Sequence, residues 1–158
     1  MKLAIGLSDT NRNGVIKLLA PLLADEYVLY TKTRNYHWNV VGPQFNDLHK
    51  FFQAQYEELD DFVDDVAERI RQLGGKSPAT LAEFMKAARL KELPGQRPNA
   101  RGMLGALLAD HEAVIRTLRA DLATAMDKFS DAGTSDFLTG LMEKHEKMAW
   151  MLRAFVEA

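Results

Sequence analysis

Four residues of types that commonly bind metal ions lie between positions 37 and 68. His37 and His49 are twelve residues apart, and Asp64 and Glu68 follow at the i, i+4 spacing that places two side chains on one helix face. Imidazole suits iron and similar transition metals, carboxylates favour hard cations, and helical bundles combine both in di-iron centres. The pattern predicts a metal centre. The alternative for Asp64 and Glu68 is a solvated acidic face.

The spacing also limits where such a centre can form. His49 and Asp64 are fifteen residues apart, which is roughly 22 Å along a helix that rises about 1.5 Å per residue. Because metal–ligand bonds are about 2 Å long, these two residues cannot bind one ion within one chain. A second copy of the helix, running antiparallel, would bring His49 of one chain beside Asp64 and Glu68 of the other. If metal binds here, the protein is at least a dimer with two equal sites.

Other candidates for chemistry are weaker. The sequence contains no cysteine, which excludes disulfides, thiolate metal sites and thiol nucleophiles. His111 and His145 have no carboxylate at ligand spacing, and His145 lies on the apolar stripe of its helix, which indicates packing.

Helices must position these residues, because apolar side chains recur in steps of three and four along most of the chain. Pro21 falls inside the first helical stretch and is expected to kink it or to cost about 3 kcal/mol. Four long helices are predicted, with apolar stripes at about residues 15–40, 45–73, 104–129 and 138–155.

The connection between the second and third long helices is expected to contain a short helix. Ser77 suits its N-cap and Pro78 its first helical position. Residues 94–98, which include two prolines and a glycine, are predicted to form a loop. No stretch alternates as a strand does. Residues 1–158 are therefore predicted to form a single all-α domain, a four-helix bundle with a crossover connection.

The composition of the chain indicates which partners and which cellular compartment to expect. Apolar residues make up 47% of the chain and charged residues 27%, as in ordinary globular proteins. No apolar run approaches the roughly 20 residues that cross a bilayer, and the N-terminus lacks the apolar region of a signal peptide, so we expect a cytoplasmic protein. The formal net charge of −2 gives no general attraction to nucleic acids.

Residues 30–40 (YTKTRNYHWNV) resemble the first-helix motif of the Dps family, the small dodecameric ferritins. The resemblance covers essentially the whole chain. It also includes the spacing of the metal-ligand candidates, the short middle helix and three tripeptides, Ala67-Glu68-Arg69, Leu73-Gly74-Gly75 and Asp110-His111-Glu112.

This resemblance implies a ferritin-like bundle assembled from two-fold dimers into a hollow shell of twelve subunits. It implies oxidation of Fe(II), with hydrogen peroxide as the preferred oxidant, and storage of Fe(III) mineral, which protects against oxidative stress. The implied ligands are His37 and His49 of one subunit with Asp64 and Glu68 of its two-fold mate. Trp38, next to His37, is implied as a radical sink or as a packing residue.

The sequence departs from the family pattern in two places. The family carries a carboxylate, usually Asp, four residues after the second histidine, whereas this chain has Gln53. A neutral amide oxygen is a poorer ligand for a hard cation, so the second iron position is expected to be weaker unless Glu57 compensates. DNA-condensing members usually have a Lys/Arg-rich tail, but Lys2 is the one basic residue among the first eleven. DNA binding is therefore not expected.

Two other functional classes are also compatible with the sequence, a DNA-compacting nucleoid protein and a metal-free helical assembly protein.

A further expectation concerns the route by which iron enters the shell. Three aspartates cluster where the third long helix ends and the fourth begins, and in a trimer they would form acidic rings that concentrate cations. They are Asp127, Asp131 and Asp136, and the alternative is that they are ordinary turn and N-cap residues.

Overall fold

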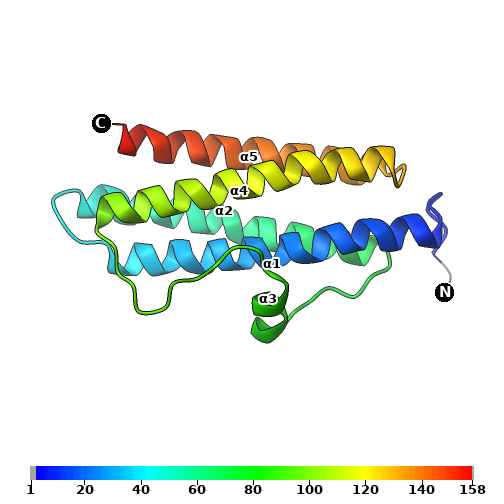
Figure 1. The fold of residues 1–158 in the computed structure, drawn as a ribbon, viewed down its shortest axis with the longest axis horizontal. Helices are drawn as coiled ribbons and strands as arrows, with labels where there is room; N and C mark the ends of the chain where they lie inside the picture. The colour runs from blue at the N-terminus through cyan, green and yellow to red at the C-terminus, as the bar shows by residue number, and fades with distance from the viewer. Residues whose placement is uncertain (1–2, 158) are drawn as a thin grey trace.

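The computed structural model describes residues 3–157, which form helices and loops without strands. The long helices are arranged as two antiparallel pairs, the first and second in the chain and the last two, packed lengthwise against each other (Figure 1). The all-α four-helix bundle predicted from the sequence is confirmed. In chain order the helices are α1 (Asp9–Asn39), α2 (Phe45–Gln72), α3 (Leu81–Ala87), α4 (Ala100–Asp127) and α5 (Ala132–Val156).

The crossover joins opposite ends of the bundle. It leaves α2, carries α3 along the side of α1, and returns to start α4 at the end where α1 turns into α2 (Figure 1). Asp25 of α1 fixes the part of the crossover that follows α3. Its carboxylate accepts hydrogen bonds from the backbone N–H groups of Arg89 and Leu90 at 2.6 and 2.9 Å, and from Nε of Arg89 at 2.7 Å. The buried carboxylate thus satisfies backbone donors that no helix would pair.

α1 continues through Pro21. Proline has no N–H to donate to the carbonyl of the preceding turn, which alone would weaken the helix. Leu19, Leu22 and Leu23 on either side of Pro21 are almost completely buried in the core. Tertiary packing therefore holds the helix where its local sequence would break it.

The short helix begins later than the sequence predicted. α3 starts at Leu81 rather than at Pro78, and its N-cap is Thr80 rather than Ser77. Thr80 Oγ1 accepts from the Glu83 N–H, and the Glu83 carboxylate accepts from the Thr80 N–H at 3.0 Å. This reciprocal capping box satisfies two donors at once, whereas Ser77 as N-cap would have Thr80 and not a Glu or Gln at the third helical position.

Glycine follows the end of α2, close to where its apolar stripe stops at about residue 73. Gly74 has φ +85°, a conformation that side-chain-bearing residues rarely adopt, and the Gly75 N–H bonds to the Ile70 carbonyl at 3.0 Å. Within residues 3–157 no helix is long and apolar enough to span a membrane.

Candidate metal centre

His37 and His49 face each other across the turn between α1 and α2. Nδ1 of His37 lies 2.7 Å from the His49 carbonyl oxygen, and Nδ1 of His49 lies 2.8 Å from the His37 carbonyl oxygen. A carbonyl only accepts, so each Nδ1 carries a hydrogen and each neutral ring has its lone pair on Nε2. Backbone carbonyls commonly orient metal-binding histidines in this way. Both residues are therefore locked in the tautomer that can bind a metal through Nε2.

Aromatic packing fixes the same two rings. The imidazoles stack with centroids 3.8 Å apart and planes 19° apart. Phe45 stacks on His49 at 5.1 Å, and the edge of the Tyr56 ring meets His37 at 5.2 Å. His37 is buried and His49 half-buried. The first turns of α2 and the last turn of α1 thus hold the pair rigidly, which the sequence spacing alone did not show.

Asp64 and Glu68 lie further along α2 and are both exposed. Neither forms an ion pair or side-chain hydrogen bond with any residue in the described part of the chain. Among residues 3–157 no three His, Asp or Glu side chains of one chain are placed to hold a metal ion. One chain brings the two histidines together but leaves the two carboxylates apart from them.

Gln53 lies one turn after His49 and is half-buried. Its Nε2 donates to Oε1 of Glu57 at 2.8 Å, one turn further along α2. Because the bond uses the amide nitrogen, the amide oxygen of Gln53 takes no part in it. At the position where the family pattern has a carboxylate, this chain therefore has an amide that is hydrogen-bonded to the carboxylate of Glu57.

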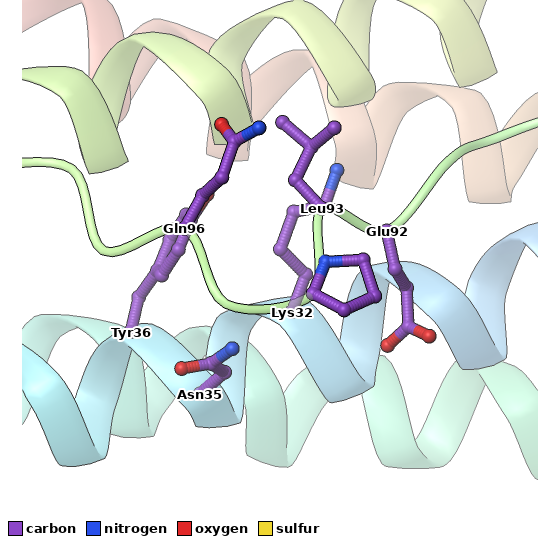
Figure 2. Close-up of a pocket in the computed structure, with 7 residues that line it drawn as sticks. Lys32, Asn35, Tyr36, Glu92, Leu93 and Gln96 are labelled. Carbon is purple, nitrogen blue, oxygen red and sulfur yellow. The ribbon is translucent and has the colours of Figure 1, made fainter.

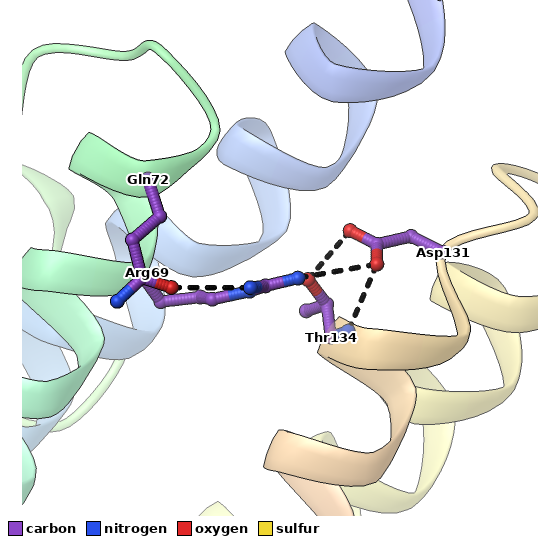
Figure 3. A network of polar contacts seen from close by, with 4 residues as sticks. All are labelled: Arg69, Gln72, Asp131 and Thr134. Atoms are coloured by element: carbon purple, nitrogen blue, oxygen red, sulfur yellow. Dashed lines mark hydrogen bonds and ion pairs between the residues drawn. The ribbon is translucent and has the colours of Figure 1, made fainter. Parts of the chain in front are cut away.

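Of the three aspartates expected at an entry pore, Asp131 is engaged in other contacts. It is the N-cap of α5 and only 3% exposed. It accepts from the Thr134 N–H and hydroxyl at 2.9 and 2.6 Å and pairs with Arg69 of α2 at 3.2 Å (Figure 3). Within one chain Asp131 therefore has the N-cap role that the sequence offered as the alternative to a pore role. Asp127 and Asp136 are exposed and remain candidates.

Trp38, next to His37, is 64% exposed, so it packs little within its own chain. The guanidinium of Arg34 lies over its ring at 5.1 Å, and also within 5.5 and 5.0 Å of the Tyr30 and Tyr56 ring centroids. The surface beside the histidine pair is thus aromatic and carries one cation.

A small cavity of about 180 Å³ is lined by Lys32, Tyr36 and residues of the loop at 92–96. Figure 2 shows these side chains between α1 and the crossover. Lys32 Nζ is 2.5 Å from Asp110 of α4. Burial raises the pKa of the Asp110 carboxyl, and Lys32 opposes that rise. The pair brings two partly buried opposite charges together and ties α1 to α4.

A polar cluster inside the bundle was not predicted from the sequence. Glu26, His111 and His145 are completely buried and hydrogen-bonded in a chain. His145 packs on Phe62, as its place on the apolar stripe predicted, but it also has two polar partners. Glu26 lies within the apolar run of α1, three residues from both Leu23 and Leu29. The presence of Glu26 on this apolar stripe was the feature of the sequence that could have indicated a buried polar cluster.

Known proteins match this chain over nearly its full length. Residues 16–158 match the ferritin family model, described as a ferritin-like domain. A low temperature-induced protein of Nostoc sp. is 51% identical over 99% of this chain and 87% of its own length. DNA protection during starvation protein 2 of Bacillus anthracis is 40% identical over 90% of this chain and 96% of its own length.

The fold matches solved structures equally well. The Dps protein of Vibrio cholerae O1, described as a member of a broad superfamily of ferritin-like diiron-carboxylate proteins, superposes with a TM-score of 0.91. It is 31% identical, with 98% of this chain and 96% of that chain covered. On the family model, the relatives and the fold, this chain belongs to the Dps family of ferritin-like proteins.

Proposed function

We propose that this protein oxidises Fe(II) at sites shared between two subunits and stores the Fe(III) product inside a hollow shell of twelve subunits. Each site takes His37 and His49 from one subunit and Asp64 and Glu68 from its two-fold mate. The observation that carries the proposal is the reciprocal bonding of the two histidines, which leaves both Nε2 lone pairs available. Asp64 and Glu68 of α2 supply the other ligands; both are exposed and form no ion pair within residues 3–157.

The donor set suits iron. Two imidazole nitrogens and two carboxylates match the ligands that helical di-iron proteins use. The carboxylates bring two negative charges to offset the charge of the bound cations, and the histidines remain neutral as ligands. The surface around the pair contains Trp38 and Phe45, which are 64% and 46% exposed in one chain. An exposed apolar surface of this kind fits a subunit contact at the site.

Iron is the substrate, and its chemistry balances with peroxide as the oxidant. Two Fe(II) ions give up one electron each, and these two electrons with two protons reduce one H₂O₂ to two water molecules. Paired transfer avoids the one-electron reduction of peroxide that releases hydroxyl radical. The chain's own residues contribute binding and orientation: the carbonyls of residues 37 and 49 hold the rings, and α2 holds the carboxylates at a fixed spacing.

Iron entry is proposed at three-fold pores lined by Asp127 and Asp136. Both are exposed, at the end of α4 and in the first turns of α5. Rings of carboxylates would concentrate cations at the pore mouth.

A second candidate, DNA compaction, is raised by the name of the Bacillus anthracis relative. The charge of the chain argues against it, because twelve copies at −2 each repel a polyanion. The basic residue of the N-terminal segment, Lys2, and the last residue, Ala158, lie outside the described residues. Retardation of duplex DNA at moderate salt would favour this candidate.

The proposal is tested by adding Fe(II) to the metal-free protein without oxygen and then adding hydrogen peroxide. We expect about one H₂O₂ consumed per two Fe(II), no hydroxyl radical trapped, and electron-dense cores in particles whose mass is twelve subunits. A stable monomer or dimer in light scattering, or oxidation no faster than in buffer, would contradict it.

A further inference from the structure

Three ionisable side chains form a chain of hydrogen bonds in the middle of the bundle. Glu26 comes from α1, His145 from α5 and His111 from α4, and all three are 0% exposed. Oε1 of Glu26 lies 3.0 Å from Nε2 of His145, and Nδ1 of His145 lies 2.9 Å from Nδ1 of His111. Oε2 of Glu26 and Nε2 of His111 are buried without a partner. The two ends of the chain are therefore unsatisfied.

Among residues 3–157 no Lys or Arg side chain forms an ion pair with this cluster. From α2 the facing side chain is Phe62, whose ring centroid is 5.2 Å from that of His145. Lys144 of α5 places its Nζ over the Phe62 ring at 4.9 Å and is itself exposed. The other buried charges of α1 are paired elsewhere, Asp25 with Arg89 and Lys32 with Asp110. The charge of the cluster is therefore set by its own protons.

The cluster does not have the shape of a metal site. Glu26 contacts His145 through Nε2 and His111 contacts it through Nδ1, so they lie at opposite edges of one ring. The three groups do not converge on a point, and no set of three ligands among residues 3–157 is placed to hold a metal. The arrangement is a row of hydrogen-bonded groups, which can carry protons.

Counting hydrogens shows what the row can do. Each of its two hydrogen bonds requires one hydrogen. With two hydrogens the row has a net charge of −1, His111 donates from Nδ1, and its Nε2 has a bare lone pair. With three hydrogens the net charge is zero. In the arrangement in which His145 donates from both ring nitrogens, His111 accepts at Nδ1 and carries its hydrogen on Nε2. In that arrangement the tautomer of His111 reports the charge of the whole row.

We propose that Glu26, His145 and His111 form a buried proton-binding site, in which uptake of one proton neutralises the core and switches His111 from the Nδ1–H to the Nε2–H tautomer. An unpaired negative charge in an apolar core is costly, which favours uptake of the third proton on folding. Burial and the neighbouring His145 lower the pKa of His111 well below its ordinary value, so a fourth proton is refused. The site is independent of the iron chemistry.

The site makes the free energy of unfolding of the bundle depend on pH. Above about pH 6.5 the unfolded chain holds two protons on these three groups, one on each neutral imidazole, whereas the folded row holds three. Folding then takes up one proton, so the unfolding equilibrium constant per subunit rises about tenfold for each pH unit of increase. The dependence ends where the folded row loses its third proton.

The experiment is nitrogen NMR of the sedimented assembly labelled with ¹⁵N-histidine, recorded from about pH 6 to 9. The chain has four histidines, and a His111→Phe sample assigns the signal. We expect His111 to carry hydrogen on Nε2 at the lower pH and on Nδ1 at the higher pH. In Glu26→Gln the amide cannot take up a proton, so the His111 tautomer is expected not to change with pH.

Phe62→Leu is the matched control, because it removes packing against His145 but no ionisable group. We expect it to lower stability and to keep the tautomer switch. A His111 tautomer that is constant over the range in the wild type would overturn the proposal, as would an unchanged switch in Glu26→Gln. If Glu26→Gln does not assemble, the wild-type titration decides alone.

Discussion

Gln53 and Glu57 are joined side chain to side chain on α2, with the Gln53 amide nitrogen donating to the Glu57 carboxylate at 2.8 Å. The bond couples the residue that replaces the expected carboxylate to a carboxylate one turn away. It orients Gln53 and gives Glu57 one neutral donor. An aspartate at position 53 could offer no such donor.

Gln53→Asp is expected to have opposite effects on the metal-free and the iron-loaded protein. Without metal, two carboxylates one turn apart repel, which costs about 0.2–0.5 kcal/mol. With metal, a third anionic ligand beside His37 and His49 should tighten binding at the weaker iron position and speed oxidation. Calorimetric titration with Fe(II) under nitrogen, and stopped-flow oxidation by peroxide, measure the two effects.

Gln53→Glu is the comparison variant, because its carboxylate is one carbon further from the backbone. We expect two classes of iron site in the wild type and more equal sites in Gln53→Asp. Equal and full occupancy of both positions in the wild type, with no gain from the substitution, would show that the amide is no handicap.

The acidic residues at the α4–α5 turn are expected to divide into two roles. Asp127→Asn with Asp136→Asn should slow Fe(II) uptake by the intact shell while leaving assembly unchanged, because both side chains are exposed. Uptake is followed by the rate of core formation at low Fe(II). The same rate in the double variant and the wild type would remove the pore assignment.

Asp131→Ala should instead reduce stability. It removes the N-cap of α5 and leaves Arg69 without its carboxylate, and loss of an N-cap costs about 0.5–2 kcal/mol. Chemical unfolding measures the loss, and Asp131→Asn serves as control because asparagine is also a good N-cap. A stability equal to that of the wild type would contradict the structural role.

Much of the bundle could be predicted from local sequence. Apolar spacing indicated all four long helices, and Gly74 marked the end of α2, because these signals act within a few residues. The start of α3 was misplaced because Pro78 was weighed above the Thr80–Glu83 pair. His37 and His49 were identified as ligands, but their reciprocal bonding depends on how α1 and α2 meet.

The buried Glu26–His145–His111 row could not be predicted in the same way. Its partners are 119 and 34 residues apart in the chain. Contacts at that separation depend on how the two helix pairs pack, which periodicity does not specify. Asp131 shows the same limit, because its partner Arg69 lies 62 residues away on another helix.

Acid is expected to open the start of α3 before the rest of the bundle. Hydrogen bonds from the Ala79 N–H, the Thr80 hydroxyl and the Thr80 N–H lower the pKa of Glu83 below its ordinary value of 4.5. A lowered folded pKa means that the capping box stabilises the helix above the unfolded pKa and is lost as pH falls through the folded one. Hydrogen exchange of residues 79–87 should rise in that window, and Glu83→Gln should remove the pH dependence. Exchange that stays constant down to the acid limit of assembly would contradict this.

The central claim, that each iron site is shared between two subunits, is tested most directly by mixing two inactive variants. One carries His49→Ala, the other Asp64→Asn with Glu68→Gln, and each alone should lose at least about tenfold in peroxide-driven Fe(II) oxidation. In a mixed two-fold dimer, one site loses both halves and the other keeps His49 from one chain and both carboxylates from its partner. Equal co-assembly should therefore restore about a quarter of the wild-type sites. Mixed shells, verified by mass spectrometry, that remain as inactive as either variant alone would contradict the account.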